Sequence, residues 1–132
     1  TDSSSYSLAL RLTENYHNEL LGDLIPAVEG TYSTYAEDTT AEGIRVSRDH
    51  RAFCGFSMGS VATWRTFQYC LDDFRYFLPS SGSLTADGED GTFRYANNEK
   101  EGNLYFLEQE GGTHNGDYAM EYFYNGLCWI WQ

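Results

Sequence analysis

The stretch that most constrains this chain is Phe53–Ser60, because it contains the pattern Gly55-x-Ser57-x-Gly59. A serine flanked at both second positions by glycine is typical of a nucleophile elbow, a tight turn between a strand and a helix. Side chains at the two glycine positions would clash with neighbouring backbone, and glycine also tolerates unusual dihedral angles. Such a turn would expose the Ser57 hydroxyl beside a helix N-terminus, which favours developing negative charge.

The segments on either side of the motif fit a strand and a helix. Arg51–Cys54 is a short, mainly apolar run that can lead into the turn. Val61–Cys70 contains neither Gly nor Pro and can form the helix that leads out of it. A loop rich in Gly and Ser is the alternative interpretation of the motif alone. The strand-turn-helix context favours the elbow.

Composition excludes several classes of function. The chain has 132 residues, enough for one domain with one core. Its formal net charge is −12 with only 8 Lys and Arg residues, which argues against binding to nucleic acid or to an anionic membrane surface. No apolar run reaches about 18 residues, so we expect no membrane span. The chain contains 11 Tyr, whose rings suit sugars and phenolic groups as well as core packing.

The cysteines do not indicate a metal site. Cys54, Cys70 and Cys128 lack the spacing of metal ligands. Cys54 and Cys70 flank the expected elbow and its helix, and we expect both to be buried as small hydrophobic residues. The odd number leaves at least one free thiol, and one disulfide remains open.

Hydrophobic spacing predicts the other elements. The N-terminal part predicts a helix that begins at Tyr6 or at Thr13, reaches Val28 and breaks near Ile25, since Pro26 follows. The other expected elements are a surface loop at Ala36–Gly43, strands at Phe74–Pro79 and Asn103–Glu108, and a helix at Tyr118–Trp131. This alternation predicts an α/β fold with parallel strands.

Two histidines are candidates for a base that activates Ser57. His50 precedes the incoming strand, at the end opposite the elbow, so we expect it to be structural. His114 lies in the glycine-rich segment Gly111–Gly116, after an expected strand. The carboxyl ends of parallel strands form one edge of a sheet, where Ser57 and Ser80–Gly82 should meet. We expect His114 to be the functional histidine, because it lies in a glycine-rich loop after a strand and follows the serine in the chain.

Several blocks of sequence resemble one known family. Ser47–Ser60 is similar to the elbow region of feruloyl esterases of carbohydrate esterase family 1, which also contains acetylxylan esterases and resembles the esterase D group. Phe77–Gly82 is similar to the family's strand after the elbow helix, and Gly102–His114 to its final strand and histidine loop. Together these blocks and the segment Leu20–Tyr35 extend the resemblance over most of the chain.

The resemblance implies an α/β-hydrolase fold, with a mostly parallel sheet flanked by helices, in one incomplete domain over residues 1–132. It implies Ser57 as nucleophile, His114 as general base and the backbone N–H of Met58 as an oxyanion donor. Asp90 fits the position of the acid best, and Asp87 is the second choice. The implied enzyme is a secreted esterase of the plant cell wall that uses no cofactor and no metal.

The chain also departs from the family. The N-terminal strands are absent, including the loop that donates the second oxyanion N–H, and so is the strand expected between Gly82 and Asp90. Asn115-Gly116 stands where family members often have a tryptophan. We therefore expect a partial chain. Thr1–Ser5 does not resemble a signal peptide, so any leader is expected outside this sequence.

The resemblance leaves the substrate open among three possibilities. The expected partners are feruloylated or acetylated xylan and its oligosaccharides. The first hypothesis is a feruloyl esterase that forms an acyl-enzyme, and the second is an acetylxylan esterase of the same family. A non-catalytic carbohydrate-binding domain, with exposed Tyr and Trp as sugar platforms, is the alternative from another class.

Overall fold

The computed structural model describes residues 6–82 and 107–131. In chain order the elements are α1 (Tyr6–Thr13), α2 (Tyr16–Glu19), the π-helix η1 (Leu20–Leu24), α3 (Ile25–Thr31), α4 (Ala41–Val46), the 3₁₀-helix η2 (Arg48–His50), β1 (Ala52–Phe56), α5 (Met58–Tyr69), β2 (Tyr76–Ser80) and α6 (Gly116–Ile130).

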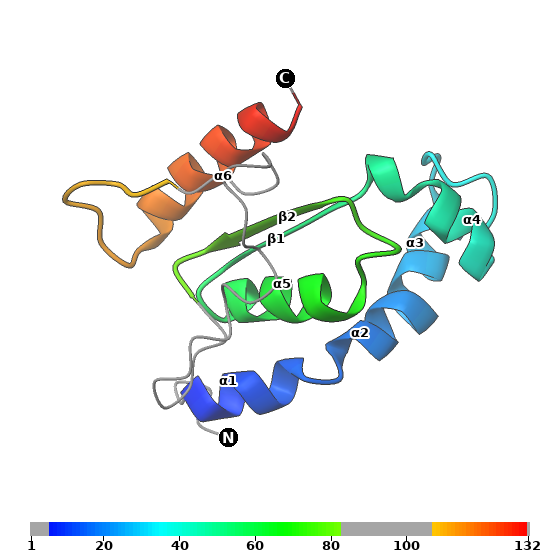
Figure 1. Cartoon of the computed structure of the whole chain (residues 1–132), viewed down its shortest axis with the longest axis horizontal. Helices are drawn as coiled ribbons and strands as arrows, with labels where there is room; N and C mark the ends of the chain where they lie inside the picture. The colour runs from blue at the N-terminus through cyan, green and yellow to red at the C-terminus, as the bar shows by residue number, and fades with distance from the viewer. Residues whose placement is uncertain (1–5, 83–106, 132) are drawn as a thin grey trace.

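The sheet of the described residues is a parallel pair, β1 and β2. Their register runs from Ala52 opposite Tyr76 to Phe56 opposite Ser80, and α5 forms the crossover between them (Figure 1). Parallel strands need such a crossover because the chain must return to the same end of the sheet. This strand pair with its flanking helices confirms the predicted α/β class with parallel strands.

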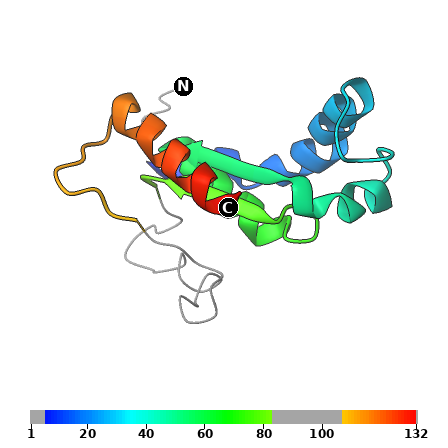
Figure 2. The ribbon, with the colours of Figure 1, turned by 90° about the horizontal axis from the view of Figure 1, so that it is seen from above.

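Helices lie on both sides of the strand pair, α5 against both strands and α6 against β2. Figure 1 shows α5, with α1 beyond it, on one side of the strands and α6 on the other, and Figure 2 shows α6 lying across the strands from above. On the α5 side, Phe77 packs edge-on against Phe67, with ring centroids 5.1 Å apart. On the other side, α6 contacts β2 so closely that a Cβ at Gly126 would lie 2.4 Å from the Leu78 side chain. A side chain at position 126 would therefore force the Leu78 side chain to move.

The N-terminal helical region begins at Tyr6, and near Ile25, where a break is predicted, the backbone stays helical while its hydrogen-bond pattern changes from π to α. The π-helix Leu20–Leu24 ends where α3 begins, and Pro26 lies in the first turn of α3. Proline has no N–H to donate and is best tolerated near the start of a helical segment. An interruption between Thr13 and Tyr16 was not predicted.

The predicted surface loop Ala36–Gly43 is wrong at its end, because α4 begins at Ala41. The side chain of Thr40 accepts a hydrogen bond from the N–H of Gly43 at 3.1 Å, which is the contact of a helix N-cap. Asp38 in turn accepts from the N–H of Thr40 at 2.9 Å. The polar residues that suggested a loop therefore cap a short helix.

The prediction that both Cys54 and Cys70 are buried holds only for Cys70. Cys70 is completely buried and packs in the core with Leu20, Ile25 and Phe74. Burial, together with the nearby Asp73 carboxylate, raises the pKa of its thiol to about 11. Cys54 is exposed because it points to the face of β1 opposite α5. All three cysteines are free, so no disulfide forms.

The predicted strand Asn103–Glu108 and the expected absence of a membrane span can be compared with the structure only in the described residues. Most of the predicted strand Asn103–Glu108 lies outside the described residues, and Leu107 and Glu108, which are described, are not in a strand. Within the part of the chain described, no helix combines the length and apolar character needed to cross a membrane.

Candidate active site

Ser57 occupies the turn between β1 and α5 in a backbone conformation that residues other than glycine rarely adopt. Its φ is 58° and its ψ is −115°, and non-glycine residues at positive φ carry local strain. Its N–H donates to the carbonyl of Ser80 at 3.0 Å, and its carbonyl accepts from Ser60 at 3.0 Å and Val61 at 3.3 Å. The turn is therefore held by β2 on one side and by α5 on the other.

The two glycines of the motif have different roles. A Cβ at Gly55 would lie 2.0 Å from the carbonyl oxygen of Gly59, so the backbones of strand and helix approach too closely for any side chain. A Cβ at Gly59 would meet nothing within 4 Å. The predicted steric reason is confirmed for Gly55 and is wrong for Gly59, whose contribution is its backbone.

His114 and Ser57 come together although 57 positions separate them. The His114 Nε2 lies 2.9 Å from the Ser57 Oγ, within hydrogen-bonding distance. The ring of His114 also stacks on Phe56, with centroids 4.6 Å apart and an interplanar angle of 28°. His114 is exposed, and Ser57 is half-buried at the carboxyl edge of the sheet. This is the geometry in which a histidine can remove the proton of a serine hydroxyl.

The loop that carries His114 is shaped by the residues around it. Gly111 has a φ of 72°, which glycine adopts without strain, and the N–H of Gly112 donates to the Gln109 carbonyl at 3.0 Å to close the turn. Asn115 then caps α6, since its side chain accepts from the N–H groups of Asp117 at 3.0 Å and Tyr118 at 3.2 Å. The start of α6 thus fixes the backbone directly after His114.

Phe56 and Asn115 are two site residues that the sequence analysis missed. The alternation of side chains along β1 could have placed Phe56 on the face opposite α5. The spacing of Asn115, just before an amphipathic run, is that of an N-cap, which was a further available signal.

Comparisons with known proteins support the sequence resemblance. No protein-family profile matches the chain. It is 52% identical over 69 residues to the endo-1,4-beta-xylanase Y of Acetivibrio thermocellus, a match that covers 52% of this chain and 6% of the xylanase. A solved structure described as FAE is 51% identical, with a TM-score of 0.50, over 51% of this chain and 24% of its own.

A second structure points the same way. It is a serine-to-alanine mutant of the feruloyl esterase module from Clostridium thermocellum in complex with sinapinate, and it is 49% identical with a TM-score of 0.50. This match covers 51% of the chain described here and 24% of the solved one. Half of this chain resembles a feruloyl esterase module. The chain nevertheless spans about a quarter of each esterase structure.

The remaining residues expected at the esterase site are placed only in part. Asp90 and Asp87 lie outside the described residues. Met58 is the first residue of α5, so its backbone N–H belongs to the first turn, where N–H groups have no acceptor within the helix. Gly82, two residues after β2, is held against α5, because its carbonyl accepts from Ser60 Oγ at 2.7 Å and Trp64 Nε1 at 3.0 Å.

A small apolar hollow adjoins the elbow. It has a volume of about 240 Å³ and is lined by residues of the N-terminal helices and of the first turn of α5: Leu12, Thr13, Tyr16, Met58, Gly59 and Ala62. Its position next to Met58 places an apolar surface beside the turn that holds Ser57.

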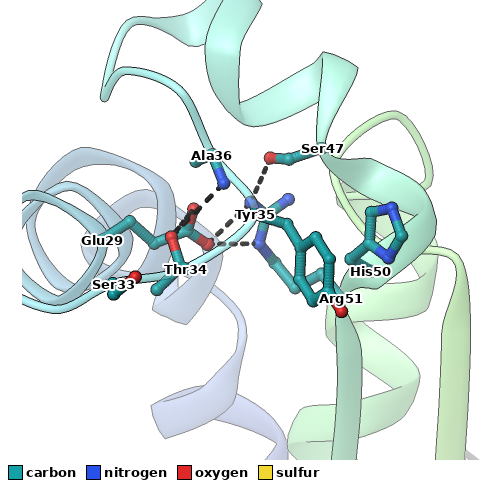
Figure 3. A pocket seen from close by; sticks show the side chains of 8 residues that line it. All are labelled: Glu29, Ser33, Thr34, Tyr35, Ala36, Ser47, His50 and Arg51. Carbon is teal, nitrogen blue, oxygen red and sulfur yellow. Dashed lines mark hydrogen bonds and ion pairs between the residues drawn. The ribbon is translucent and has the colours of Figure 1, made fainter.

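A larger hollow, of about 540 Å³, lies at the other end of β1 and is the one drawn in Figure 3. Its centre is Arg51, whose Nε donates to Glu29 at 2.8 Å and whose other N–H groups reach Glu29, Ser47 and the carbonyls of Ile44 and Asp73. The five N–H groups of Arg51 thus all have acceptors. The size of this hollow does not make it the reactive site, because its buried charges are already paired.

His50 lines this larger hollow and lies ahead of β1, at the end of the strand opposite the elbow, where the sequence predicts it. It stacks on Tyr35 with centroids 3.9 Å apart and an interplanar angle of 11°. Among the described residues, no group of three His, Cys, Asp or Glu side chains is arranged to hold a metal ion.

Proposed function

We propose that this chain carries the reactive centre of a serine carboxylesterase with the α/β-hydrolase fold. The observation that carries the proposal is the 2.9 Å separation of His114 Nε2 from Ser57 Oγ, across 57 positions of sequence, at the carboxyl edge of a parallel strand pair. Ser57 is the nucleophile and His114 the general base. The strained turn at Ser57 supports the assignment, because such strain clusters at functional sites.

In the first half of the reaction, His114 takes the hydroxyl proton of Ser57 through Nε2 while Oγ attacks the ester carbonyl carbon. The tetrahedral intermediate collapses when the carbon–oxygen bond to the alcohol breaks. The departing alkoxide takes the proton from His114, and the acyl group remains on Ser57 as an ester.

In the second half, His114 takes a proton from water, and the hydroxide oxygen attacks the acyl carbon. The bond to Ser57 Oγ then breaks, Oγ regains the proton and the carboxylic acid leaves. No cofactor or metal takes part in this cycle. The negative oxygen of each intermediate lies near the start of α5, where the Met58 N–H is the proposed donor and the helix dipole is favourable.

Asp90 is the proposed acid that orients His114 and stabilises its cation, with Asp87 as the second choice. Both follow β2 and Gly82 in the sequence, in the chain order serine, acid, histidine of α/β-hydrolases. The assignment rests on the sequence alone, because both aspartates lie outside the described residues.

The proposed substrate is feruloylated xylan or its oligosaccharides, in the plant cell wall, and the proposed protein is secreted. The similar structures are feruloyl esterase modules, one of them bound to sinapinate, and the similar curated protein is a xylanase. The proposed aromatic acyl group would bury its ring in the apolar hollow that Met58 lines, whereas an acetyl group has little apolar surface to bury. The net charge of −12 opposes a nucleic acid partner.

Hydrolysis of methyl ferulate by the unchanged chain and by Ser57→Ala tests this function. We expect turnover of methyl ferulate that exceeds that of 4-nitrophenyl acetate, and a loss of at least about 10⁴-fold in Ser57→Ala. A preference for the acetate would instead indicate an acetyl esterase. Retention on insoluble xylan with no hydrolysis of either ester would indicate a carbohydrate-binding domain and refute the proposal.

A further inference from the structure

Phe56 is the side chain against which the ring of His114 rests. The two rings stack with centroids 4.6 Å apart at 28°, and the same imidazole reaches Ser57 Oγ with Nε2. Phe56 therefore touches the base on its flat side while Ser57 touches it at its edge. The three residues form a chain of contact in which two are consecutive in sequence.

Strand periodicity explains why Phe56 lies there. Successive side chains of a strand point to opposite faces, and Gly55 lies against the α5 backbone at Gly59. Phe56 consequently points to the other face, where α6 packs against Leu78 of β2. His114 is two positions ahead of α6 and reaches the edge of the sheet from that same side.

Among the described residues, the imidazole of His114 lies in open surroundings. His114 is exposed, and the hydrogen bonds of Asn115 fix the backbone beside it rather than its ring. A histidine with a fixed backbone still rotates about two side-chain bonds. A flat ring 4.6 Å away restricts that rotation and keeps Nε2 in the direction of Ser57.

We propose that Phe56 is a positioning residue that holds the imidazole of His114 in line with Ser57. The inference rests on the proposed function, since it concerns the orientation of the proposed base. Phe56 acts through His114 and is not assigned a contact with the substrate. Its contribution is orientation, which is worth much because small displacements of a catalytic group slow reactions strongly.

The other two histidines provide internal controls. His17 stacks on Tyr69, with centroids 4.3 Å apart at 26°, and His50 stacks on Tyr35, with centroids 3.9 Å apart at 11°. Each of the three histidines of the chain thus has an aromatic partner of its own. A change at Phe56 should alter only one of the three imidazoles.

The test compares Phe56→Leu with Phe56→Tyr. Leucine keeps an apolar side chain but removes the flat face, whereas tyrosine keeps the ring. For methyl ferulate we expect Phe56→Leu to lower kcat about 10-fold or more with little change in KM, because the base and not the binding surface is disturbed. Phe56→Tyr should restore kcat to within about 3-fold of the unchanged chain.

Proton NMR of the imidazole rings supplies a readout that does not depend on activity. The ring protons of His114 should show an upfield ring-current shift in the unchanged chain and in Phe56→Tyr, and should lose it in Phe56→Leu. The ring protons of His17 and His50 should not move. Unchanged signals from these two also verify that Phe56→Leu is folded.

Each contrary outcome identifies what has failed. A folded Phe56→Leu that keeps the full kcat overturns the inference, and so does a His114 signal that is the same in all three proteins. Loss of kcat in Phe56→Tyr equal to that in Phe56→Leu also contradicts it. If the unchanged chain shows no reaction that depends on Ser57, the proposed function fails together with the inference. If the reaction depends on Ser57 but Phe56→Leu catalyses it as fast as the unchanged chain, only the inference about Phe56 fails.

Discussion

Two polar clusters lie at the two ends of β1, and they differ in how far their hydrogen-bonding groups are satisfied. Arg51, just before the strand, has an acceptor for each of its five N–H groups. Its ion pair with Glu29 is only 10% and 11% exposed. Ser57, just after the strand, has a strained backbone, and its hydroxyl lies within hydrogen-bonding distance of the exposed imidazole of His114.

The difference separates a structural site from a reactive one. A buried charge whose partners are all in place stabilises the fold and has no free hydrogen-bonding group with which to bind a ligand. A hydroxyl in a strained turn, paired with an exposed base, contributes little to stability but can give up its proton. The larger hollow thus belongs to the Arg51 end, and the proposed chemistry to the Ser57 end.

Removing the arginine should have the largest effect on stability. We expect Arg51→Leu to lower the free energy of unfolding by about 3–5 kcal/mol, because it leaves the Glu29 carboxylate buried without its partner. Urea denaturation followed by circular dichroism measures the change. The reactivity of Ser57 should be nearly unaffected in whatever fraction stays folded.

Arg48→Leu is the matched control for the arginine. Arg48 pairs with Asp49, and the two side chains are 35% and 56% exposed. Its Nε also donates to the Leu71 carbonyl at 2.6 Å, so the loss should be about 1 kcal/mol. Equal losses from the two substitutions would show that the Arg51 cluster is no more structural than an ordinary surface pair.

The next largest effect on stability concerns the close approach of Gly55 to the backbone of Gly59 in the elbow. We expect Gly55→Ala to cost about 2–3 kcal/mol, because its Cβ would lie 2.0 Å from the carbonyl oxygen of Gly59 and backbone cannot easily move aside. Gly59→Ala has free space around its Cβ and should be neutral or stabilising, as alanine favours helices. Thermal unfolding of both variants measures the contrast, and a Gly55→Ala as stable as Gly59→Ala would refute the elbow geometry.

The smallest effect tests the strain at Ser57 itself. At a φ of 58°, Ser57→Gly should raise the free energy of unfolding by about 1 kcal/mol while removing the nucleophile. Ser57→Ala keeps the Cβ and therefore the strain, so its stability should match that of the unchanged chain within about 0.5 kcal/mol. A glycine variant less stable than the alanine variant would mean that the turn stores no strain.

The sequence predicted the elbow well because its signal is local. The clash that forces glycine at position 55, the strand before it and the helix after it all lie within a short stretch. The juxtaposition of His114 with Ser57 was predictable only through chain order and family resemblance, since it depends on packing across the whole fold. The stack on Phe56 depends on the same packing and was missed.

Other parts of the prediction failed for identifiable physical reasons. The apolar neighbours of Cys54 in the sequence predict burial, but alternation along β1 turns its side chain away from α5, and it is exposed. Thr40 lies in the predicted loop, although a threonine directly before the helix formers Ala41 and Glu42 also fits an N-cap. Polar residues favour loops and caps for the same hydrogen-bonding reason, so composition alone does not separate the two.

The most direct test of the reactive centre is covalent labelling by a fluorophosphonate, followed by mass spectrometry of the peptides. The account predicts that the unchanged chain is labelled at Ser57, and that His114→Ala slows the labelling by about 10³-fold or more. Labelling of Ser57 at the same rate in both proteins, or no labelling at Ser57 in the folded unchanged chain, would contradict the claim that Ser57 and His114 act together.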